Sequence, residues 1–130
     1  MNQPSTPRAV FERLLQGISD GAWSEIADLY AEDAVVDIPF ATPPVHIEGR
    51  AEIHRHFLRG ADLPLTLTAR NVVVHETTDP EVVIAEFDYE IQGVRAARSA
   101  NVQVLRLRDG KIVATRDYHD HAAIAGSLVA

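Results

Sequence analysis

The stretch from Val82 to Ile91 constrains the fold most, because apolar and acidic side chains alternate along it. Apolar residues at every second position lie between acidic ones, in the order Val83, Ala85, Glu86, Phe87, Asp88, Tyr89, Glu90. Successive side chains of a β-strand point to opposite faces of a sheet, so this period of two predicts a strand that is buried on one face and wetted on the other. The pattern favours an antiparallel sheet that is covered on one side only.

Further β-prone segments surround this strand. Residues 65–76 precede it, and a long run after the Gln92-Gly93 turn ends at Arg108. Asp109-Gly110 is typical of a two-residue hairpin turn, which predicts that a last strand, Lys111–His119, pairs with the run before it. A short strand is also expected at 35–38. The segment from Pro39 to Val45 carries three prolines and is predicted to be a loop.

Helices are expected mainly in the first half of the chain. Thr6-Pro7 is a favourable helix start, and Val10, Phe11, Leu14, Leu15 and Ile18 then recur at helical spacing up to Asp20-Gly21. Shorter helices are predicted at 23–30, 49–60 and 122–129. Helices first and hairpin-linked strands afterwards predict an α+β fold, in which a mostly antiparallel sheet carries helices on one side. A curved sheet covered in this way leaves room for an internal pocket.

Length and composition limit the classes of function. The 130 residues fit one domain, 1–130, with a polar tail at 1–6. Nineteen acidic and twelve basic side chains give a net charge of −7, which argues against nucleic acid as a partner. The chain has no cysteine, so thiolate metal sites and a cysteine nucleophile are excluded. The start of the chain shows no leader pattern and no apolar run is long enough to span a membrane, so a cytoplasmic protein is expected.

Asp117 and His119 form the candidate catalytic pair. They lie two residues apart on the last predicted strand, so both side chains point to the same face. A carboxylate beside an imidazole can move a proton at a carbon next to a carbonyl, and the two groups are expected within hydrogen-bonding reach of each other or of a shared water. The alternative is a salt-bridged histidine on a surface strand. A metal site using His119 and His121 lacks an obvious third ligand, so no metal and no cofactor are predicted.

Two other polar residues are candidates for contact with a bound molecule. His56 lies on the apolar side of the helix predicted at 49–60, three residues after Ile53, and could instead simply pack there. Asp37 interrupts an apolar strand and reaches a pocket only through a bulge, because the alternation of the strand places Ile38 inward.

Three segments give the chain a family resemblance. They are Leu29-Tyr30-Ala31-Glu32-Asp33-Ala34-Val35, Ile47-Glu48-Gly49-Arg50 and Arg116-Asp117-Tyr118-His119-Asp120. From about Pro7 to Leu128 the chain resembles the nuclear transport factor 2-like superfamily, in particular its SnoaL-like and ketosteroid isomerase-like branch. The resemblance implies a cone-shaped, cystatin-like fold around a pocket, and a small hydrophobic molecule as the partner. The pocket would be lined by His56, Phe87, Tyr89, Asn101, Gln103, Leu105, Thr115, Asp117 and His119.

The resemblance does not extend to the isomerase machinery. Ketosteroid isomerases place a tyrosine and two carboxylates where this sequence has Leu14, Ile38 and Gln103. The leading hypothesis is therefore a cofactor-independent cyclase, isomerase or lyase acting on a small carbonyl compound. Asp117 would be the acid and base, His119 its partner, and Asn101 and Gln103 neutral donors. A ligand-binding or protein-interaction module without chemistry, or an epoxide hydrolase-like enzyme, are the alternatives.

A homodimer is expected through the outer face of the sheet. If even-numbered residues point outward, that face carries apolar residues flanked by both signs of charge: Val102, Val104, Ile112, Ala114, Glu86, Asp88, Glu90, Arg106 and Arg108. Such a mixed face suits a self-complementary patch about a two-fold axis. The two arginines would supply the counter-charges for the acidic row of the neighbouring strand.

Overall fold

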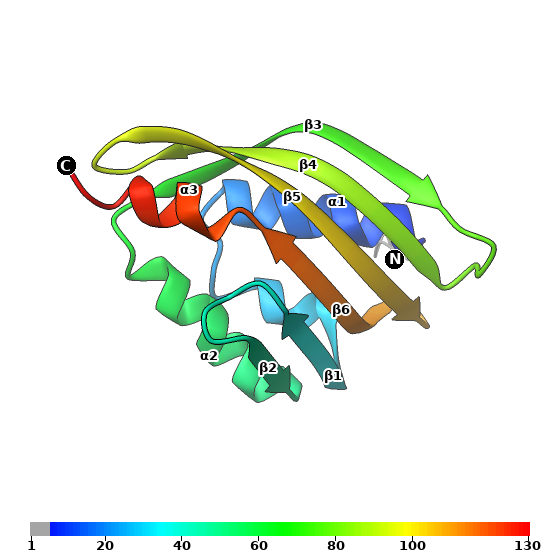
Figure 1. Ribbon diagram of the computed structural model, residues 1–130. Helices are drawn as coiled ribbons and strands as arrows, with labels where there is room; N and C mark the ends of the chain where they lie inside the picture. The colour runs from blue at the N-terminus through cyan, green and yellow to red at the C-terminus, as the bar shows by residue number, and fades with distance from the viewer. Residues whose placement is uncertain (1–5) are drawn as a thin grey trace.

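The computed structural model describes residues 6–130 and arranges its strands in one curved sheet (Figure 1). The order across the sheet is β2-β1-β6-β5-β4-β3. The bounds are β1 Tyr30–Ile38, β2 Val45–Glu48, β3 Thr66–Glu76, β4 Val82–Gln92, β5 Ala96–Arg108 and β6 Lys111–His119. β1 and β6 pair in parallel and the other neighbours are antiparallel. The predicted α+β class with a mostly antiparallel sheet is confirmed.

The helices are α1 Pro7–Ser19, the 3₁₀ turn η1 Ile26–Leu29, α2 Arg50–Ala61 and α3 His121–Gly126. Thr6 caps α1, since its hydroxyl accepts a hydrogen bond from the backbone N–H of Ala9 at 3.1 Å. Thr6 is therefore part of the helix start, and the rest of the predicted tail, residues 1–5, lies outside the described residues. No helix in residues 6–130 is both long and apolar enough to cross a membrane.

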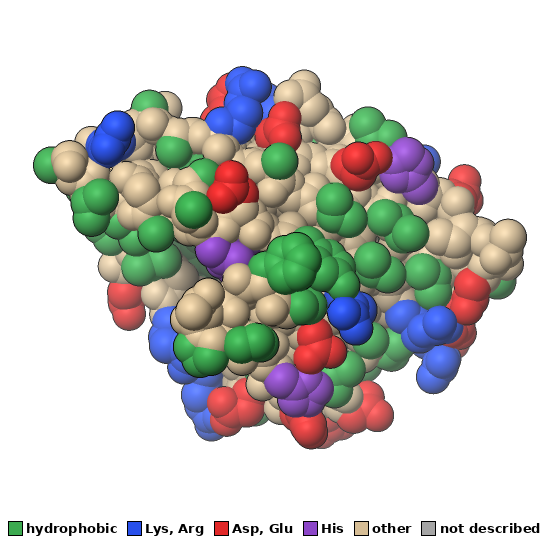
Figure 2. All heavy atoms as spheres, viewed as in Figure 1, with side chains coloured by type: hydrophobic (Ala, Val, Ile, Leu, Met, Phe, Trp, Pro, Cys, Tyr) green, Lys and Arg blue, Asp and Glu red, His purple; other side chains and the backbone are tan. Residues whose placement is uncertain are grey.

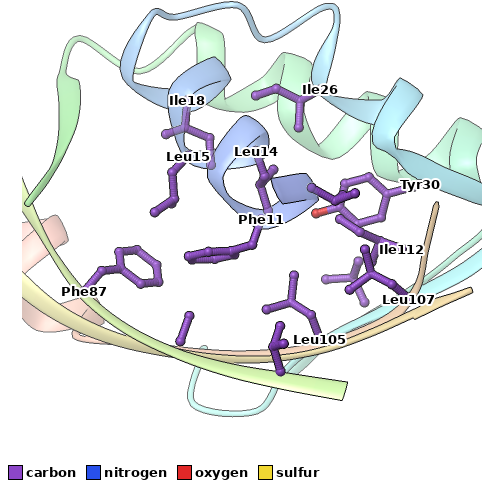
Figure 3. Packing of buried hydrophobic residues seen from close by; sticks show 14 of the residues in the cluster. Phe11, Leu14, Leu15, Ile18, Ile26, Tyr30, Phe87, Leu105, Leu107 and Ile112 are labelled. Atoms are coloured by element: carbon purple, nitrogen blue, oxygen red, sulfur yellow. The ribbon is translucent and has the colours of Figure 1, made fainter. Parts of the chain in front are cut away.

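The core lies between α1 and the concave face of the sheet (Figure 3). The α1 stripe predicted from helical spacing is buried, and the rings of Phe11 and Phe87 meet with centroids 5.6 Å apart. Leu105 from β5 and Ile112 from β6 close the other side of this layer, both fully buried. Burying four such side chains contributes roughly 1.5–3 kcal/mol each.

Two short segments differ from the prediction. The helix expected at 23–30 is only the η1 turn, and Tyr30 already begins β1. Val45 lies in β2 rather than in the proline-rich loop. β2 has four residues, and it forms because it pairs with β1 through contacts such as Ile38 opposite Val45. A strand this short carries too few residues to show a period of two.

A β-bulge changes the face to which Ile112 points. In the β5–β6 register Arg106 lies opposite Ala114, whereas Leu107 lies opposite Ile112, so one extra residue is inserted on β6. Ile112 is fully buried in consequence. Its predicted place on the outer face is wrong, while Val102, Val104 and Ala114 keep that orientation with partly exposed side chains.

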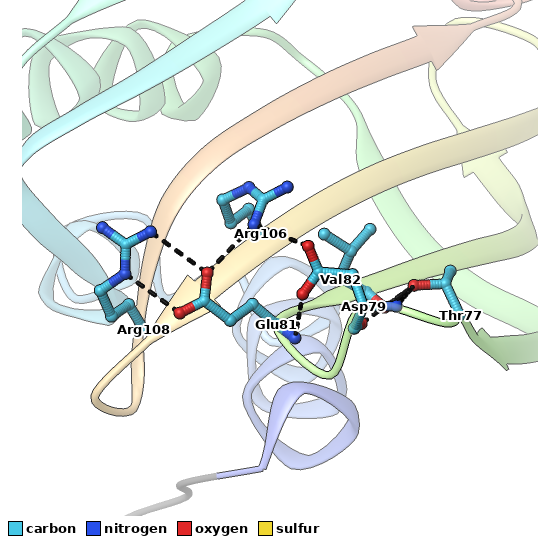
Figure 4. A network of polar contacts seen from close by, with 6 residues as sticks. All are labelled: Thr77, Asp79, Glu81, Val82, Arg106 and Arg108. Carbon is cyan, nitrogen blue, oxygen red and sulfur yellow. Dashed lines mark hydrogen bonds and ion pairs between the residues drawn. The ribbon is translucent and has the colours of Figure 1, made fainter.

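The two outer-face arginines pair within the chain at the β3–β4 turn (Figure 4). Arg106 Nη1 lies 3.0 Å from carboxylate oxygens of Asp79 and Glu81, and Arg108 Nε lies 3.1 Å from Glu81. Arg106 stands opposite Val82, at the end of β4 far from Glu90. Within one chain these arginines therefore do not pair with the acidic row, and their pairing with it across a contact between two copies stays a prediction.

The acidic row of β4 finds its partners elsewhere. Glu86 pairs with His75 at 2.7 Å, and Glu90 lies 3.3 Å from Arg70 on β3. Asp88 accepts a hydrogen bond from Asn71 at 2.8 Å. These contacts are largely exposed, so each contributes little to stability.

Candidate functional site

A cavity of about 420 Å³ lies between the helices and the concave face of the sheet. Its wall is mostly apolar, and its polar or aromatic-polar members are Trp23, Tyr30, His56, Arg59, Tyr89, Gln103, Asp117, His119 and His121. This size and this lining are typical of a pocket that holds a small, largely apolar molecule with a few polar groups.

Asp117 supplies the buried carboxyl group of the cavity. It lies on β6 opposite Gln103 of β5, and only 8% of the residue is exposed. The bulge at Val113 sets this orientation, because it brings both Ile112 and Thr115 to the concave side. Its Oδ1 is buried and has no hydrogen-bond partner among the described residues. A buried polar atom without a partner is uncommon and is expected where a ligand completes its hydrogen bonds.

The environment of Asp117 disfavours its charge. Burial raises the pKa of Asp117 to about 7, and the negative charge of Asp37 acts in the same direction. The polar side chains of Thr115 and Gln103 beside the carboxyl group lower this pKa and so limit the rise. At neutral pH the group is divided between its acid and base forms, the state in which a carboxyl group can both take up and return a proton.

His119 is held by Asn101 rather than by Asp117. The Asn101 side-chain amide donates to the backbone oxygens of Phe87 and Ser99 at 3.3 and 3.2 Å. The Asn101 Oδ1 is therefore the acceptor in its 2.9 Å contact with Nδ1 of His119. This assigns the proton to Nδ1 and leaves Nε2 with its lone pair. The direct hydrogen bond expected between Asp117 and His119 is not formed, and a shared water stays a prediction.

His119 is neutral at physiological pH. Burial, together with the neighbouring His121 and His56, lowers the pKa of His119 to about 4. The imidazole can thus accept a hydrogen bond at Nε2 from a bound polar group. Among its protein neighbours alone it carries no positive charge at this pH.

Two tyrosines face the cavity near Asp117. Burial raises the pKa of both Tyr89 and Tyr30, and the Asp117 carboxylate raises each further. Both phenols therefore keep their protons and can act as hydrogen-bond donors. Figure 3 shows the Tyr30 ring extending from β1 into the interior. Tyr30 was missed because the sequence placed it on a helix; its register with Ala34, Val36 and Ile38 was the available signal.

The structure separates the remaining predicted residues into two groups. His56 and Gln103 line the cavity. Phe87 packs against Phe11 and the Tyr89 ring, and Asn101 lies behind His119, so neither lines it.

Asp37 lies outside the cavity, which corrects its predicted role in substrate binding. The alternation of β1 sends Val36 and Ile38 inward, and both line the cavity. Asp37 points to the other face, where its Oδ1 lies 2.5 Å from Nδ1 of His46. No bulge intervenes at this end of β1, so the inward route that the prediction required is absent from its pairing with β2.

Leu14, Ile38 and Gln103 all line the cavity. The positions that hold the acids of ketosteroid isomerases are thus cavity positions here, occupied by groups that cannot exchange a proton. Among the described residues of the cavity wall, the carboxyl group is supplied by Asp117. In residues 6–130 no group of three or more His, Asp or Glu side chains is arranged to hold a metal ion.

α3 closes one end of the cavity and was only partly anticipated. Its first residue, His121, and Ile124 line the cavity wall. The helix is fixed at its far end by the turn after β4, where the backbone N–H of Arg95 donates to the Ser127 oxygen at 3.0 Å. A side chain at Gly93 has no room there, because a Cβ would lie 2.5 Å from the Ser127 oxygen.

We expect Gly93→Ala to loosen α3. The backbone must shift to admit the methyl group, at a cost of about 1–3 kcal/mol in the free energy of unfolding. Gly126→Ala, a substitution in α3 itself, is the matched control, because nothing lies within 4 Å of a Cβ built at Gly126. Urea unfolding of both variants checks the expectation; equal stabilities would contradict it.

A family model described as a SnoaL-like domain matches residues 11–115 of the 130. The chain belongs to the SnoaL-like family. The match ends before Asp117 and His119, so no role for these two residues is carried over with family membership.

Relatives of this SnoaL-like chain support the same assignment. An uncharacterized PhzA/B-like protein of Pseudomonas aeruginosa is 33% identical over 112 residues, which cover 82% of this chain and 76% of that protein. The crystal structure of a Bacillus subtilis protein named "Putative Isomerase" superimposes with a TM-score of 0.81 at 25% identity, covering 93% of this chain and 94% of the other.

A third comparison concerns the fold alone. A Catenulispora acidiphila protein with a ketosteroid isomerase-like fold, solved in complex with trimethylamine, aligns with a TM-score of 0.78 at 14% identity over 95% of this chain and 93% of its own. The SnoaL-like resemblance is thus confirmed by the family match, and the ketosteroid isomerase-like fold by this superposition.

Proposed function

We propose that this protein is a cofactor-independent enzyme that moves a proton on a small, largely apolar carbonyl compound. The observation that carries the proposal is the Asp117 carboxyl group, which lines an apolar cavity with an unpartnered Oδ1. Burial brings its pKa to about 7, close to the pH at which it would work. A general base and acid is most effective when its pKa lies near the working pH.

The proposed step begins with the Asp117 carboxylate. It removes a proton from the carbon next to the substrate carbonyl, and the electron pair of the broken C–H bond forms an enolate. The same proton then returns from the carboxylic acid to another carbon, which gives an isomer, or to the alkoxide formed when the enolate carbon attacks a second carbonyl, which gives a ring. No oxidant or other reactant is consumed in either route.

The enolate oxygen requires hydrogen-bond donors. Tyr89 and Tyr30 are protonated phenols that line the cavity, and the amide of Gln103 lies on the same wall. Asn101 is not available for this role, since its amide already donates to Phe87 and Ser99. Preorganised donors of this kind typically account for about 10²–10³ in rate each.

Hydrogen–deuterium exchange tests the proposal without knowledge of the natural substrate. The enzyme is incubated in D₂O with a panel of small cyclic ketones and 1,3-diketones, and deuterium at the carbon next to the carbonyl is followed by NMR. We expect exchange whose rate rises with pH and levels off above about pH 7, as the Asp117 carboxylate forms. No exchange with any compound, or a rate that rises with no plateau, would contradict the proposal.

A non-catalytic binding module is the second candidate. It is favoured by the loss of acid and base groups at Leu14, Ile38 and Gln103, which leaves the cavity with a single carboxyl group. This candidate predicts saturable binding of the same compounds with no deuterium incorporated, so the exchange experiment separates the two.

We propose further that two copies associate through the outer face of the sheet. Figure 2 shows hydrophobic side chains across this face, bordered by acidic and basic ones. Phe40 is 66% exposed and Val73 50% exposed, beside a groove that Val102 and Tyr118 also line. Exposed apolar residues gathered in this way are more common at interfaces than on the surface of a monomer.

Sedimentation at micromolar concentration tests this association. We expect a particle of twice the 14.3 kDa chain mass, and we expect Val102→Glu to reduce it to the single chain by placing a charge within the contact. A wild-type protein that sediments at 14.3 kDa would overturn the proposal.

A further inference from the structure

We propose that one end of the cavity is a subsite for an anionic group, formed by His56, Arg59, His119 and His121, and that the substrate is a small apolar carboxylic acid. This inference rests on the proposed function, because it names the class of substrate that the same cavity would take. The subsite requires that these four groups, each of which carries or can take up a positive charge, lie close to one another in the cavity wall.

The four side chains come from three elements and are linked as neighbours, since His121 and His56 act on the pKa of His119 and Arg59 acts on that of His56. His56 and Arg59 lie one turn apart on α2, His119 ends β6 and His121 begins α3, and all four line the cavity. The rings of His119 and His121 meet edge to face, with centroids 5.8 Å apart.

No acidic side chain of the described residues satisfies these groups. None of the four takes part in an ion pair within residues 6–130. Asp120, which lies between the two histidines in sequence, instead accepts a hydrogen bond from the backbone N–H of Ala123. Nε2 of His121 is buried without a partner. Arg59 therefore offers N–H donors to a ligand, and a histidine that takes up a proton adds a further donor and a positive charge.

The pKa values of the histidines and of Asp117 are shifted by different neighbours. The pKa of His119 is lowered by burial and by His121 and His56, and the pKa of His56 by burial and by Arg59. The pKa of Asp117 responds instead to Thr115, Asp37 and Gln103. A carboxylate bound between the histidines would remove their mutual repulsion and raise their pKa values, because it supplies the opposite charge.

An anionic subsite at the histidines would give the substrate an orientation. Its carboxylate would lie against Arg59 and the histidines, and its carbon next to the carbonyl would lie near Asp117 and the tyrosines. The opposite orientation places two carboxylates together at Asp117 in an apolar wall, which is strongly unfavourable. A neutral carbonyl compound gains from hydrogen bonds at this end but not from the positive charge.

A matched pair of ligands tests the subsite. Cyclohexanecarboxylate and cyclohexanecarboxamide have nearly the same shape and differ in charge, and their affinities are measured by titration calorimetry at about pH 6 and about pH 8. We expect the carboxylate to bind about tenfold more tightly than the amide at the lower pH, since charge-assisted hydrogen bonds are about twice as strong as neutral ones. The advantage should shrink at the higher pH, where protons are no longer taken up by the histidines and Asp117 is ionised.

Three variants identify the groups responsible. Arg59→Gln and His121→Gln are each expected to weaken binding of the carboxylate several-fold and to weaken binding of the amide much less, because the amide loses only neutral hydrogen bonds. His54→Gln is the control, because His54 lies on α2 but does not line the cavity. Asp117→Asn should retain the pH dependence that the histidines cause. NMR of the imidazole nitrogens should show the pKa of His119 rising when the carboxylate binds.

The outcomes separate this inference from the proposed function. Equal affinities for carboxylate and amide at about pH 6, or no measurable binding of the carboxylate at millimolar concentration, would overturn the subsite even if deuterium exchange is observed. A clear preference for the carboxylate in a protein that catalyses no exchange would support the subsite and overturn the catalytic proposal.

Discussion

Asp117→Asn is expected to lower the rate of deuterium exchange by about 10²–10⁴-fold, the usual contribution of a positioned acid or base. Asparagine has nearly the same shape as aspartate but cannot take up the proton. Among the described residues that line the cavity, Asp117 alone has a carboxyl group, so none of these neighbours can replace it. Ligand affinity should change far less than the rate, because the cavity wall keeps its form.

Asp37→Asn is the matched control for this expectation. Asp37 lies on the same sheet but outside the cavity, where it contacts His46. Its removal should leave the exchange rate within a few-fold of the wild type and lower the apparent pKa slightly, since its charge helps to raise the pKa of Asp117. An Asp117→Asn variant with the wild-type rate, or a large loss in Asp37→Asn, would assign the chemistry to another group.

Local signals account for most of the correctly predicted fold. Asp109-Gly110 forms the β5–β6 turn with φ values of 53° and 77°, the left-handed conformations that a type I′ hairpin requires. Thr6-Pro7 starts α1 for an equally local reason. Each signal needs only neighbouring residues, so the sequence contains it in full.

The errors come from interactions between strands. The bulge that turns Ile112 inward depends on the pairing of β6 with β5, and the ion pairs of Arg106 depend on the register of β5 with β4, which places Arg106 opposite Val82. Neither is encoded in one segment. Tyr30 belongs to β1 because β1 pairs with β6 in parallel, a long-range contact that competes with the local tendency to continue the preceding helical turn.

In the candidate site, too, the features set by local spacing were predicted and those set by contacts between strands were not. The spacing of Asp117 and His119 indicated a shared face, and both line the cavity. The partner of His119 could not be found in this way, because Asn101 approaches from the neighbouring strand, directly opposite it. His121 lies beyond the end of β6, where strand periodicity no longer predicts orientation.

The second large effect is on stability, and it has the opposite sign to the effect on activity. The pKa of Asp117 is near 3.8 in the unfolded chain and about 7 in the fold, so the folded state binds the proton more tightly between these values. The free energy of unfolding therefore falls as pH rises through this window, by about 4 kcal/mol in all. Asp117→Asn removes this loss, so the variant should be more stable than the wild type at about pH 8.

His119 acts in the reverse direction over almost the same window. Its pKa is near 6.5 unfolded and about 4 in the fold, so the folded state binds the proton less tightly. Its contribution of about 3 kcal/mol is present above pH 6.5 and is lost as pH falls toward 4. In the wild type the two residues therefore nearly cancel between about pH 4 and pH 6.5, and the pair adds little slope to the stability profile.

Single substitutions are expected to reveal the two opposed slopes. Relative to the wild type, Asp117→Asn should gain stability as pH rises from about 4 to about 7, whereas His119→Gln should lose stability as pH rises from about 4 to about 6.5. Urea unfolding at each pH measures both differences, and taking differences removes the contribution of all other titrating groups that the variants share. If the stability profiles of both variants run parallel to that of the wild type, neither residue has a shifted pKa in the fold. A group whose pKa is the same in the folded and unfolded chain cannot change the slope of the profile.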